Sequence, residues 1–453
     1  MAPEPSTNSD SASSSERSLG LWMCTALVVG NMIGSGIFLL PAALAPFGAI
    51  SIAGWIATSV GALALALVFG RVARMVPKTG GPYAYTREAF GDFPGFLVAW
   101  GYWIALWAGN AAVAVGFASY VGFFFPAVAE NPVVGLAVAL GAIWLVTFVN
   151  LRGVGAAGLV QLFTAILKVL PLLVVGGIGL AFIEPGHFHP PNRSDLSNSA
   201  AIAACATLTL WAFLGLESAT VPAGNVRRPE ITIPRATVLG TCIAAGVYSL
   251  VTVAAIGLVP PEVLETSTAP LALAAQTFLG GWGGILVALG AIVSTFGTLN
   301  GFTLLTGQVP YGAARDGVFP ALFGRLSGRG TPAVALVISN ILASGLIAMN
   351  FTKGLVEQFT FIILLATLTT LVPYVFCALS EVVLRLRAGP GERPGAATVL
   401  LGLLAFVYSA WAIYGAGEEV VYYGFLLLIA GFPVYVWTKG FNSEASGEAL
   451  EEP

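Results

Sequence analysis

The stretch Asn31-Met-Ile-Gly-Ser-Gly-Ile-Phe38 lies in the middle of an apolar run from Leu19 to Ala45. The run is long enough to cross a bilayer as one helix. Its Gly34-Ser35-Gly36 triplet disfavours continuous helix, because each Gly costs about 1 kcal/mol relative to Ala in a helix interior. Non-helical backbone at membrane depth is tolerated only where protein buries it or where it lines a cavity. The stretch therefore predicts a broken transmembrane helix whose free backbone groups face a solute at the midplane.

The composition places the whole chain in a membrane. Of its 453 residues 57% are hydrophobic and 9% charged, with a mean hydropathy of +0.88, whereas a soluble domain carries about 25% charged residues. The apolar runs are near 20 residues long, which excludes an outer-membrane barrel and predicts an all-α polytopic protein. All four cysteines fall in apolar runs without metal-ligand spacing, so we expect them to be buried and without disulfides, and we expect no metal or cofactor.

Twelve apolar spans can be counted, at about 20–43, 48–75, 94–125, 132–150, 155–183, 200–223, 234–259, 281–307, 332–349, 355–377, 396–415 and 419–438. Of the 19 Lys and Arg residues, only Arg193 and Lys353 fall in loops on one side, and Lys168 lies inside a span. The rest lie on the other side, which predicts an inner-membrane protein with both termini cytoplasmic. Residues 439–453 would form an acidic cytoplasmic tail. The Ser-rich residues 1–18 and the acidic residues 444–453 are expected to be disordered.

A second interruption mirrors the first. The sixth span contains Gly215 and Glu217, and Pro222 follows Glu217 by five residues, just as Pro41 follows Gly36. Two interrupted spans at matching places in two oppositely oriented halves are the best sequence indication of a transporter's binding site. We therefore expect five spans (19–183) repeated inverted (200–377), followed by two additional spans (396–438) with a scaffold or dimer role. The alternative is that these glycines only permit tight helix packing.

Two ionisable side chains, Lys168 and Glu217, lie deep within predicted spans. Each costs about 2.5–3.5 kcal/mol on insertion scales, so each is a candidate functional residue. Glu217 would hold a cationic solute or close a gate. The ammonium of Lys168 would replace a bound sodium ion beside the unwound segment and take part in proton coupling. The alternative is a buried ion pair between the two that fixes the helix bundle.

The two breaks together suit the backbone of an amino acid. A helix that restarts after Gly36 presents free N–H groups to a carboxylate, and one that ends before Gly215 presents free carbonyls to an ammonium. The side-chain pocket would come from other spans, with candidates Trp211, Phe213, Asn110, Trp107, Phe302, Ala366 and Thr367, although aromatic residues in apolar spans are often only packed. Tyr102 and Tyr374 are better candidates for a gate with Glu217, because a buried hydroxyl needs a partner.

Four ordered motifs resemble the amino acid–polyamine–organocation family: Asn31-Met-Ile-Gly-Ser-Gly-Ile-Phe-Leu-Leu-Pro41, Lys78-Thr-Gly-Gly-Pro-Tyr-Ala-Tyr85, Leu210-Trp-Ala-Phe-Leu-Gly-Leu-Glu-Ser218 and Gly301-Phe-Thr-Leu-Leu-Thr-Gly-Gln308. The similarity runs from about residue 17 to 440, and the motifs are similar to those of the bacterial arginine/agmatine antiporters of that family. It implies a LeuT-type five-plus-five inverted repeat with discontinuous first and sixth helices, often assembled as a homodimer, that exchanges amino acids or their amines.

The resemblance also implies roles for single residues. The substrate carboxylate would meet Ser35 and Gly36, and the α-amino group would meet carbonyls of Met32, Trp211 and Leu214. Trp211 would cover the substrate, Tyr102, Glu217 and Tyr374 would form the inner gate, and the distal pocket would hold Asn31, Ala105, Leu106, Asn110, Phe302 and Ala366. Three of these depart from the arginine/agmatine pattern: Phe302 replaces a tryptophan, Leu106 a cysteine and Ala366 a serine. Lys168 instead resembles proton-coupled permeases and light-chain exchangers of the same superfamily.

We therefore predict a sodium-independent amino acid exchanger that works by alternating access. Our first hypothesis is an antiporter for cationic amino acids or amines, and the alternative is a proton-coupled permease for neutral amino acids. A channel would not need a gate carboxylate, and an enzyme would need a nucleophile–base pair or metal ligands that the spans do not contain. The expected partners are a small-molecule substrate, membrane lipid and a second copy of the chain, and no nucleic acid is expected.

Overall fold

The computed structural model describes residues 20–78, 80–152, 164, 167–220, 223 and 226–448. Residues 1–18, Pro222 and much of the predicted span 155–183 lie outside the described residues, so the expectations for them are not addressed by the structure. The described chain is built of helices: α1 (Leu21–Met32), α2 (Ser35–Leu44), α3 (Ile50–Met75), α4 (Pro82–Phe90), α5 (Asp92–Gly122), α6 (Pro126–Glu130), α7 (Pro132–Leu151), α9 (Val169–Leu173), α10 (Asn198–Leu210), α11 (Pro229–Leu258), α12 (Pro261–Thr266), α13 (Pro270–Arg315), α14 (Ala333–Asn350), α15 (Leu355–Ala388), α16 (Ala396–Gly415), α17 (Glu418–Ile429) and α18 (Gly431–Glu448).

Ten helical segments of the described chain are long and apolar enough to cross a membrane. Two shorter apolar helices, Val169–Phe182 and Ala333–Met349, stand at the places of the predicted fifth and ninth spans. The protein is therefore a multi-pass helical membrane protein, because segments of this length and apolarity need about 30 Å of hydrocarbon to bury them.

Several boundaries differ from the predicted spans. Helix α13 is 46 residues long and bends at Gly280, whose φ of 65° is a conformation that glycine adopts without strain. The predicted last span divides at Ala430 into α17 and α18, and α18 continues to Glu448, so the tail expected to be disordered begins inside a helix. Three of the four cysteines are buried as expected, but Cys242 is exposed, so that expectation was wrong for one residue.

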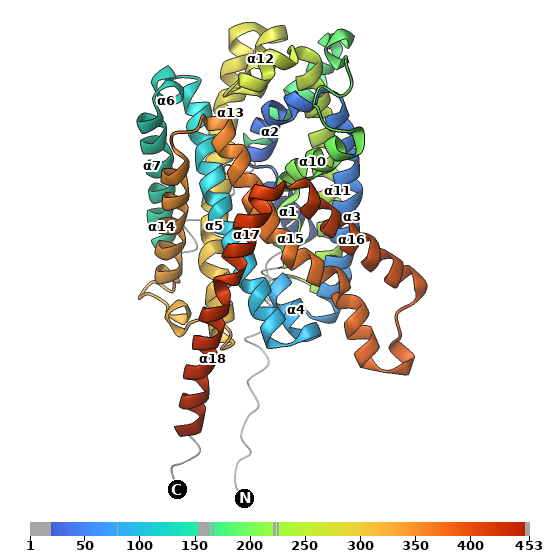
Figure 1. Ribbon diagram of the computed structural model, residues 1–453, viewed down its shortest axis with the longest axis vertical. Helices are drawn as coiled ribbons and strands as arrows, with labels where there is room; N and C mark the ends of the chain where they lie inside the picture. The colour runs from blue at the N-terminus through green and yellow to red at the C-terminus, as the bar shows by residue number, and fades with distance from the viewer. Residues whose placement is uncertain are drawn as a thin grey trace, which may run out of the picture.

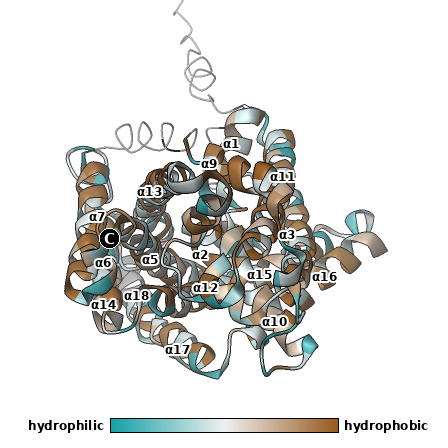
Figure 2. Ribbon diagram, turned by 90° about the horizontal axis from the view of Figure 1, so that it is seen from above, coloured by the Kyte–Doolittle hydropathy of each residue, from teal (hydrophilic) through white to brown (hydrophobic). Residues whose placement is uncertain are grey.

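The helices pack around α5, which contacts α13, α15, α7 and α14 (Figure 1). A second group consists of α1, α3, α10 and α11, in which α3 packs on α10 and α11 while α1 packs on α11. The short helix α2 lies toward the middle when the bundle is seen from above and contacts helices of both groups (Figure 2). All ten residues of α2 are buried, as are residues 30–34 at the break, whereas the start of α1 is exposed at Trp22 and Met23.

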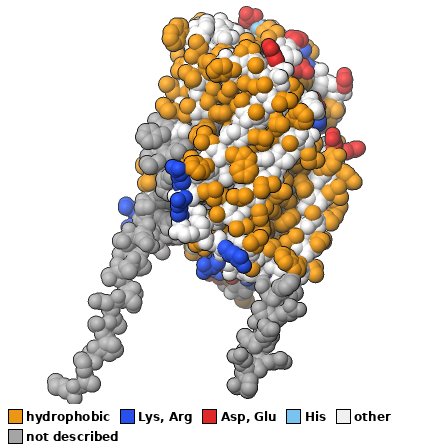
Figure 3. Space-filling model, turned by 90° about the vertical axis from the view of Figure 1, so that its left-hand side faces the viewer, with side chains coloured by type: hydrophobic (Ala, Val, Ile, Leu, Met, Phe, Trp, Pro, Cys, Tyr) orange, Lys and Arg blue, Asp and Glu red, His pale blue; other side chains and the backbone are white. Residues whose placement is uncertain are grey.

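Charges separate toward the two ends of the molecule. In Figure 3 the acidic side chains gather at the upper end, where Figure 1 places α12, and most of the visible Lys and Arg side chains lie lower down. On α12, Glu262 forms an ion pair with Arg193. We name these the acidic end and the basic end.

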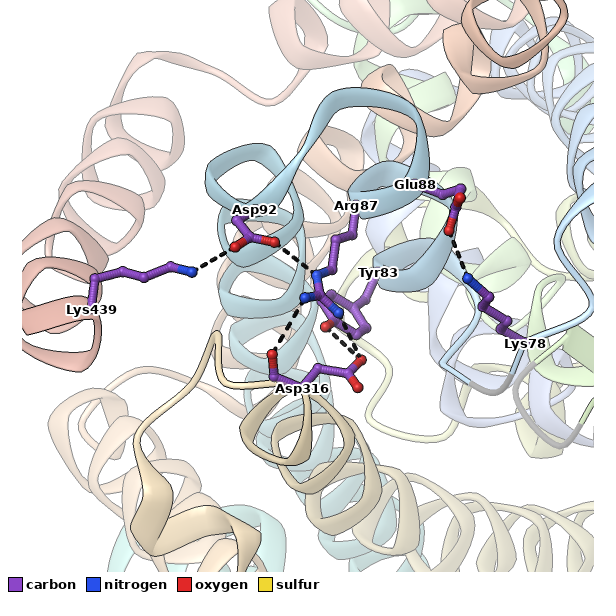
Figure 4. A network of polar contacts seen from close by, with 7 residues as sticks. All are labelled: Lys78, Tyr83, Arg87, Glu88, Asp92, Asp316 and Lys439. Atoms are coloured by element: carbon purple, nitrogen blue, oxygen red, sulfur yellow. Dashed lines mark hydrogen bonds and ion pairs between the residues drawn. The ribbon is translucent and has the colours of Figure 1, made fainter. Parts of the chain in front are cut away.

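At the basic end, α4, α5, α13 and α18 are joined by a polar network (Figure 4). Arg87 of α4 is 2.9 Å from Asp92 and 3.4 Å from Asp316, and Tyr83 donates a hydrogen bond to Asp316 at 2.8 Å. Lys439 of α18 is 2.5 Å from Asp92. The hydrogen bond with Asp92 raises the pKa of Arg87, so its guanidinium stays charged. The network ties the last helix to the rest of the molecule at this end.

Candidate functional site

The first helix is interrupted where the sequence indicates, but slightly earlier. Helix α1 ends at Met32, Ile33 (ψ 90°) and Gly34 (φ −126°, ψ −138°) leave helical geometry, and α2 begins at Ser35. The last two residues of the predicted glycine triplet therefore belong to the first turn of α2. Glycine is needed at position 34 for space, because a Cβ there would lie 2.8 Å from Cγ2 of Thr298 on α13.

Lys168 occupies this first break. Its Nζ donates hydrogen bonds to the carbonyls of Gly30 (2.5 Å) and Ile33 (2.9 Å), and its side chain is fully buried. The hydroxyls of Ser294 and Thr298 on α13 each lie 3.4 Å from the same Ile33 carbonyl. The end of α1 has carbonyls without helical partners, and a cation from the fifth span, supported by α13, satisfies two carbonyls at the break.

The second interrupted span has a matching break. Helix α10 ends at Leu210, a 3-10 turn follows over Trp211–Phe213, and Leu214 is extended (ψ 132°). Gly215 has φ +102°, a conformation that a residue with a Cβ adopts only with strain. Here the glycine is required by backbone geometry, whereas at the first break it is required by space.

Glu217 follows this break and is 1% exposed. Its two carboxylate oxygens accept hydrogen bonds from the hydroxyls of Tyr102 on α5 (2.6 Å) and Tyr374 on α15 (2.8 Å). Among the described residues, neither Glu217 nor Lys168 has an ion-pair partner. The alternative in which the two midplane charges pair with each other is therefore wrong, because each is held at its own break.

The two breaks contact each other. Nδ2 of Asn31 donates to Oγ of Ser218 at 2.8 Å, and a Cβ on Gly215 would lie 3.1 Å from Cβ of Asn31. Likewise a Cβ on Gly36 would lie 2.9 Å from Cδ1 of Trp211. The first turn of α2, with its free N–H groups, therefore faces the end of α10 across a distance that only small residues permit.

A narrow cavity of about 10 Å³ lies beside the second break. It is lined by Tyr102, Ala105, Leu106, Leu214, Gly215, Glu217, Phe302, Leu305 and Thr370. Trp211 packs edge-on against Phe302 with ring centroids 6.3 Å apart, and each side chain is 5% exposed. This volume holds about one water molecule, so the cavity has to widen to admit a small molecule.

The structure brings many, but not all, of the predicted site residues to this cavity. Six of them line it: Tyr102, Ala105, Leu106, Leu214, Glu217 and Phe302. Seven others do not line it but are buried: Asn31, Met32, Ser35, Gly36, Asn110, Trp211 and Ala366. Leu305 and Thr370 were missed, although each lies one helical turn from a predicted residue, Phe302 and Ala366 respectively, so helical periodicity could have found them.

Four fully enclosed polar atoms of the candidate residues named from the sequence lack a hydrogen-bond partner in the described part of the chain. They are Oγ of Ser35, Nε1 of Trp107, Oδ1 of Asn110 and Oγ1 of Thr367. A buried polar atom without a partner is costly. Ser35 stands at the start of α2, where its hydroxyl and the free N–H groups of the first turn offer donors to an anion.

An open hollow of about 800 Å³ lies at the acidic end. Its lining includes Ala42 and Ala43 of α2 and five charged side chains, Glu265, Lys353, Glu357, Glu418 and Glu419. Lys353 lies 3.7 Å from Glu357 and 4.8 Å from the ring centroid of Phe361. The hollow carries excess negative charge and reaches the outer end of the broken first helix.

These features define a class of protein. Two interrupted membrane helices meet at a buried, polar site, and the described residues contain no group of three or more His, Cys, Asp or Glu side chains that could hold a metal ion. Such a site handles a solute in the interior of a membrane protein.

The comparisons with known proteins agree with that class. The family model for amino acid permeases matches residues 19–434. The chain is 34% identical to a putative arginine/ornithine antiporter of Bacillus subtilis over 426 residues, which are 87% of this chain and 90% of the relative. It is 36% identical to the cadaverine/lysine antiporter of Escherichia coli K12 over 372 residues (80% and 83%). It is 32% identical to the arginine/ornithine antiporter of Pseudomonas aeruginosa over 445 residues (94% and 92%).

The chain therefore belongs to the amino acid permease family, which is part of the amino acid–polyamine–organocation superfamily. The resemblance inferred from the four sequence motifs is confirmed. The relatives are transporters rather than enzymes.

Proposed function

We propose that this protein exchanges amino acids or their amines across the inner membrane by alternating access. Twelve membrane helices would form a five-plus-five inverted repeat with two additional helices, and both termini would be cytoplasmic, at the basic end. The observation that carries the proposal is the meeting of two helix breaks beside a narrow cavity, with a buried carboxylate held by tyrosines from two other helices. The antiporter activities of the relatives support the same conclusion.

The breaks would hold the backbone of the substrate. Its carboxylate would accept hydrogen bonds from the first turn of α2 at Ser35 and Gly36, where the helix dipole is positive. Its amino group would donate to carbonyls of Met32, Trp211 and Leu214, and Trp211 would cover it from the acidic end. The unpartnered hydroxyl of Ser35 supports this assignment.

Glu217, Tyr102 and Tyr374 would form the gate toward the basic end. Both hydrogen bonds to Glu217 join helices that are distant in sequence, so breaking them would let α5 and α15 separate from the second break. Bonds to a charged acceptor are stronger than neutral ones, which suits a gate that has to stay closed until substrate has bound.

Lys168 would make exchange independent of sodium. Its ammonium already satisfies two carbonyls at the first break, where a bound cation would otherwise be needed to neutralise the end of α1. The same residue would couple transport to protons if it loses its proton during the cycle.

The substrate would be a cationic amino acid or its amine, as in the named relatives. Excess negative charge in the open hollow supports this choice, because it raises the local concentration of cations. The alternative is a proton-coupled permease for neutral amino acids, which the apolar side chains of Leu106, Phe302 and Ala366 favour.

Counterflow in proteoliposomes tests the proposal. Vesicles loaded with one unlabelled compound from a panel of lysine, ornithine, arginine, agmatine, cadaverine, putrescine and alanine would be placed in the same labelled compound, with and without sodium and with and without a pH gradient. We expect sodium-independent uptake of a cationic amino acid that requires a compound inside. Uptake of alanine driven by a proton gradient would support the alternative, and no uptake of any compound would contradict both.

A further inference from the structure

A chain of buried hydrogen bonds connects four helices and ends at Asn110. On α7, Oγ1 of Thr147 donates to the carbonyl of Ile143 at 2.7 Å. On α14, Nδ2 of Asn340 donates to Oγ1 of Thr147 at 2.8 Å. On α5, Nδ2 of Asn110 donates to Oδ1 of Asn340 at 3.2 Å and to Oγ1 of Thr303 on α13 at 3.1 Å. We name Thr147, Asn340 and Asn110 the amide relay.

The hydroxyl of Thr147 fixes which groups of the amide relay donate hydrogen bonds and which accept them. The hydroxyl of Thr147 has a single proton and gives it to Ile143, one helical turn before, as threonines inside helices commonly do. The hydroxyl can then only accept from Asn340, so Asn340 must turn its N–H group toward Thr147 and its oxygen toward Asn110. Asn110 in turn must donate, and both of its N–H bonds are used.

This direction leaves the side-chain oxygen of Asn110 without a partner. Oδ1 is fully buried and accepts no hydrogen bond from the described residues, and the residue is 0% exposed. An acceptor left in this state is rare in folded proteins and is satisfied when a ligand supplies a donor.

The position of Asn110 relates this oxygen to the cavity. Asn110 lies one helical turn after Leu106, a cavity-lining residue, and side chains four residues apart share a helix face. A Cβ on the neighbouring Gly109 would lie 3.2 Å from both Phe302 and Trp211. The part of α5 that carries Asn110 therefore packs against Phe302, which lines the cavity, and against Trp211. It lies about two helical turns from Tyr102, whose hydroxyl bonds to Glu217.

We propose that Thr147 and Asn340 are positioning residues that hold the oxygen of Asn110 as an acceptor for the far end of the substrate. This rests on the proposed exchange of amino acids or amines. A side chain that ends in an ammonium or guanidinium group gives the oxygen its missing donor, whereas an apolar side chain of the same length leaves it unpaired. The relay therefore selects a cationic over a neutral substrate, although neither positioning residue touches it.

The test is the ratio of two inhibition constants in proteoliposomes. Uptake of labelled lysine into lysine-loaded vesicles is inhibited with unlabelled lysine or with norleucine, which has a methyl group in place of the CH₂–NH₃⁺ end of lysine. A hydrogen bond to a charged donor predicts that the wild-type protein prefers lysine by about 10- to 100-fold.

Thr147→Val removes the acceptor that orients Asn340 while keeping the shape of the side chain. The amide of Asn340 can then present either its oxygen or its nitrogen to Asn110. We expect the preference for lysine over norleucine to fall about tenfold. Asn340→Leu should lower it at least as far, and Thr147→Ser, which keeps the hydroxyl, should restore it. Thr252→Val on α11 is the matched control, because it removes a buried hydroxyl that has no partner in the described chain.

Each outcome bears on the inference. A wild-type ratio in Thr147→Val, with a thermal unfolding midpoint like that of Thr252→Val, would overturn the relay and leave amino acid exchange intact. A wild-type preference for norleucine over lysine would also overturn the relay but support a neutral substrate. Absence of exchange with any amino acid or amine would overturn the proposed function and the relay together. If Asn340→Leu does not fold, Thr147→Val and Thr147→Ser decide the question.

Discussion

Each helix break holds one buried charged side chain, and the two side chains differ in the sign of their charge and in the groups that they bond to. At the first break an ammonium, Lys168, bonds to two backbone carbonyls of the broken helix itself. At the second break a carboxylate, Glu217, bonds to hydroxyls of Tyr102 and Tyr374 on two other helices. Both charges are buried, and neither is paired with an opposite charge among the described residues.

The difference lies in what must change for each contact to be broken. The carbonyls that Lys168 satisfies cannot turn away without changing the break, so the lysine braces the first break. The tyrosine hydroxyls can leave Glu217 by side-chain rotation or by movement of α5 and α15. We infer that the first break keeps its backbone conformation during transport. The contacts of the second break with α5 and α15 are the ones that separate when the gate opens.

The largest effect should follow the loss of the brace. Lys168→Met keeps an unbranched side chain, one heavy atom shorter, but leaves the carbonyls of Gly30 and Ile33 without this donor, at about 1–3 kcal/mol for each buried group left unsatisfied. We expect exchange in proteoliposomes to fall below detection and the thermal unfolding midpoint in detergent to drop. Lys78→Met is the control, since that lysine is exposed and lies away from both breaks and from the open hollow. Undiminished exchange by Lys168→Met would show that the brace is not needed.

A slightly smaller effect is expected from the backbone of the second break. Gly215→Ala places a Cβ at φ +102° and 3.1 Å from Cβ of Asn31, which costs about 1–2 kcal/mol in backbone strain alone. We expect exchange to fall about tenfold. Gly345→Ala in α14 is the control, because its Cβ would meet nothing within 4 Å. Equal activities of the two variants would mean that the second break tolerates ordinary residues.

Loss of a tyrosine hydroxyl at the gate should shift the equilibrium between its closed and open forms without abolishing exchange. Tyr374→Phe removes one hydrogen bond to a charged acceptor, worth about 1.5–3 kcal/mol, and should favour the form that is open toward the basic end by about tenfold or more. Opening is measured as the labelling rate of Leu106→Cys by a membrane-impermeant thiol reagent, in a chain whose exposed Cys242 is replaced by Ser. Tyr422→Phe on α17, an exposed tyrosine, is the control. A labelling rate unchanged by Tyr374→Phe would indicate that Glu217 is not a gate.

The sequence predicted these features unevenly, for physical reasons. Hydropathy located the spans because burial in lipid requires continuous apolar length, and the glycines located both breaks to within two residues. The sequence could not show that Lys168 meets Gly30, 138 positions away, because such contacts depend on how helices rotate and pack. The amide relay was missed for the same reason: Thr147 and Asn340 are unremarkable residues of apolar spans until packing aligns them.

The smallest effect should come from charges outside the membrane interior. Lys439→Met removes the contact between α18 and Asp92 at the basic end, but both side chains are about 40% exposed, and exposed pairs contribute about 0.2–1 kcal/mol. We expect exchange to be unchanged and the unfolding midpoint to fall by no more than about 2 °C, with the difference disappearing in 1 M salt, where charges are screened within about 3 Å. If exchange by Lys439→Met fell as far as exchange by Lys168→Met, the contrast between the two breaks would have no basis. A solvated ion pair at the helix ends would then matter as much as a buried cation at a break.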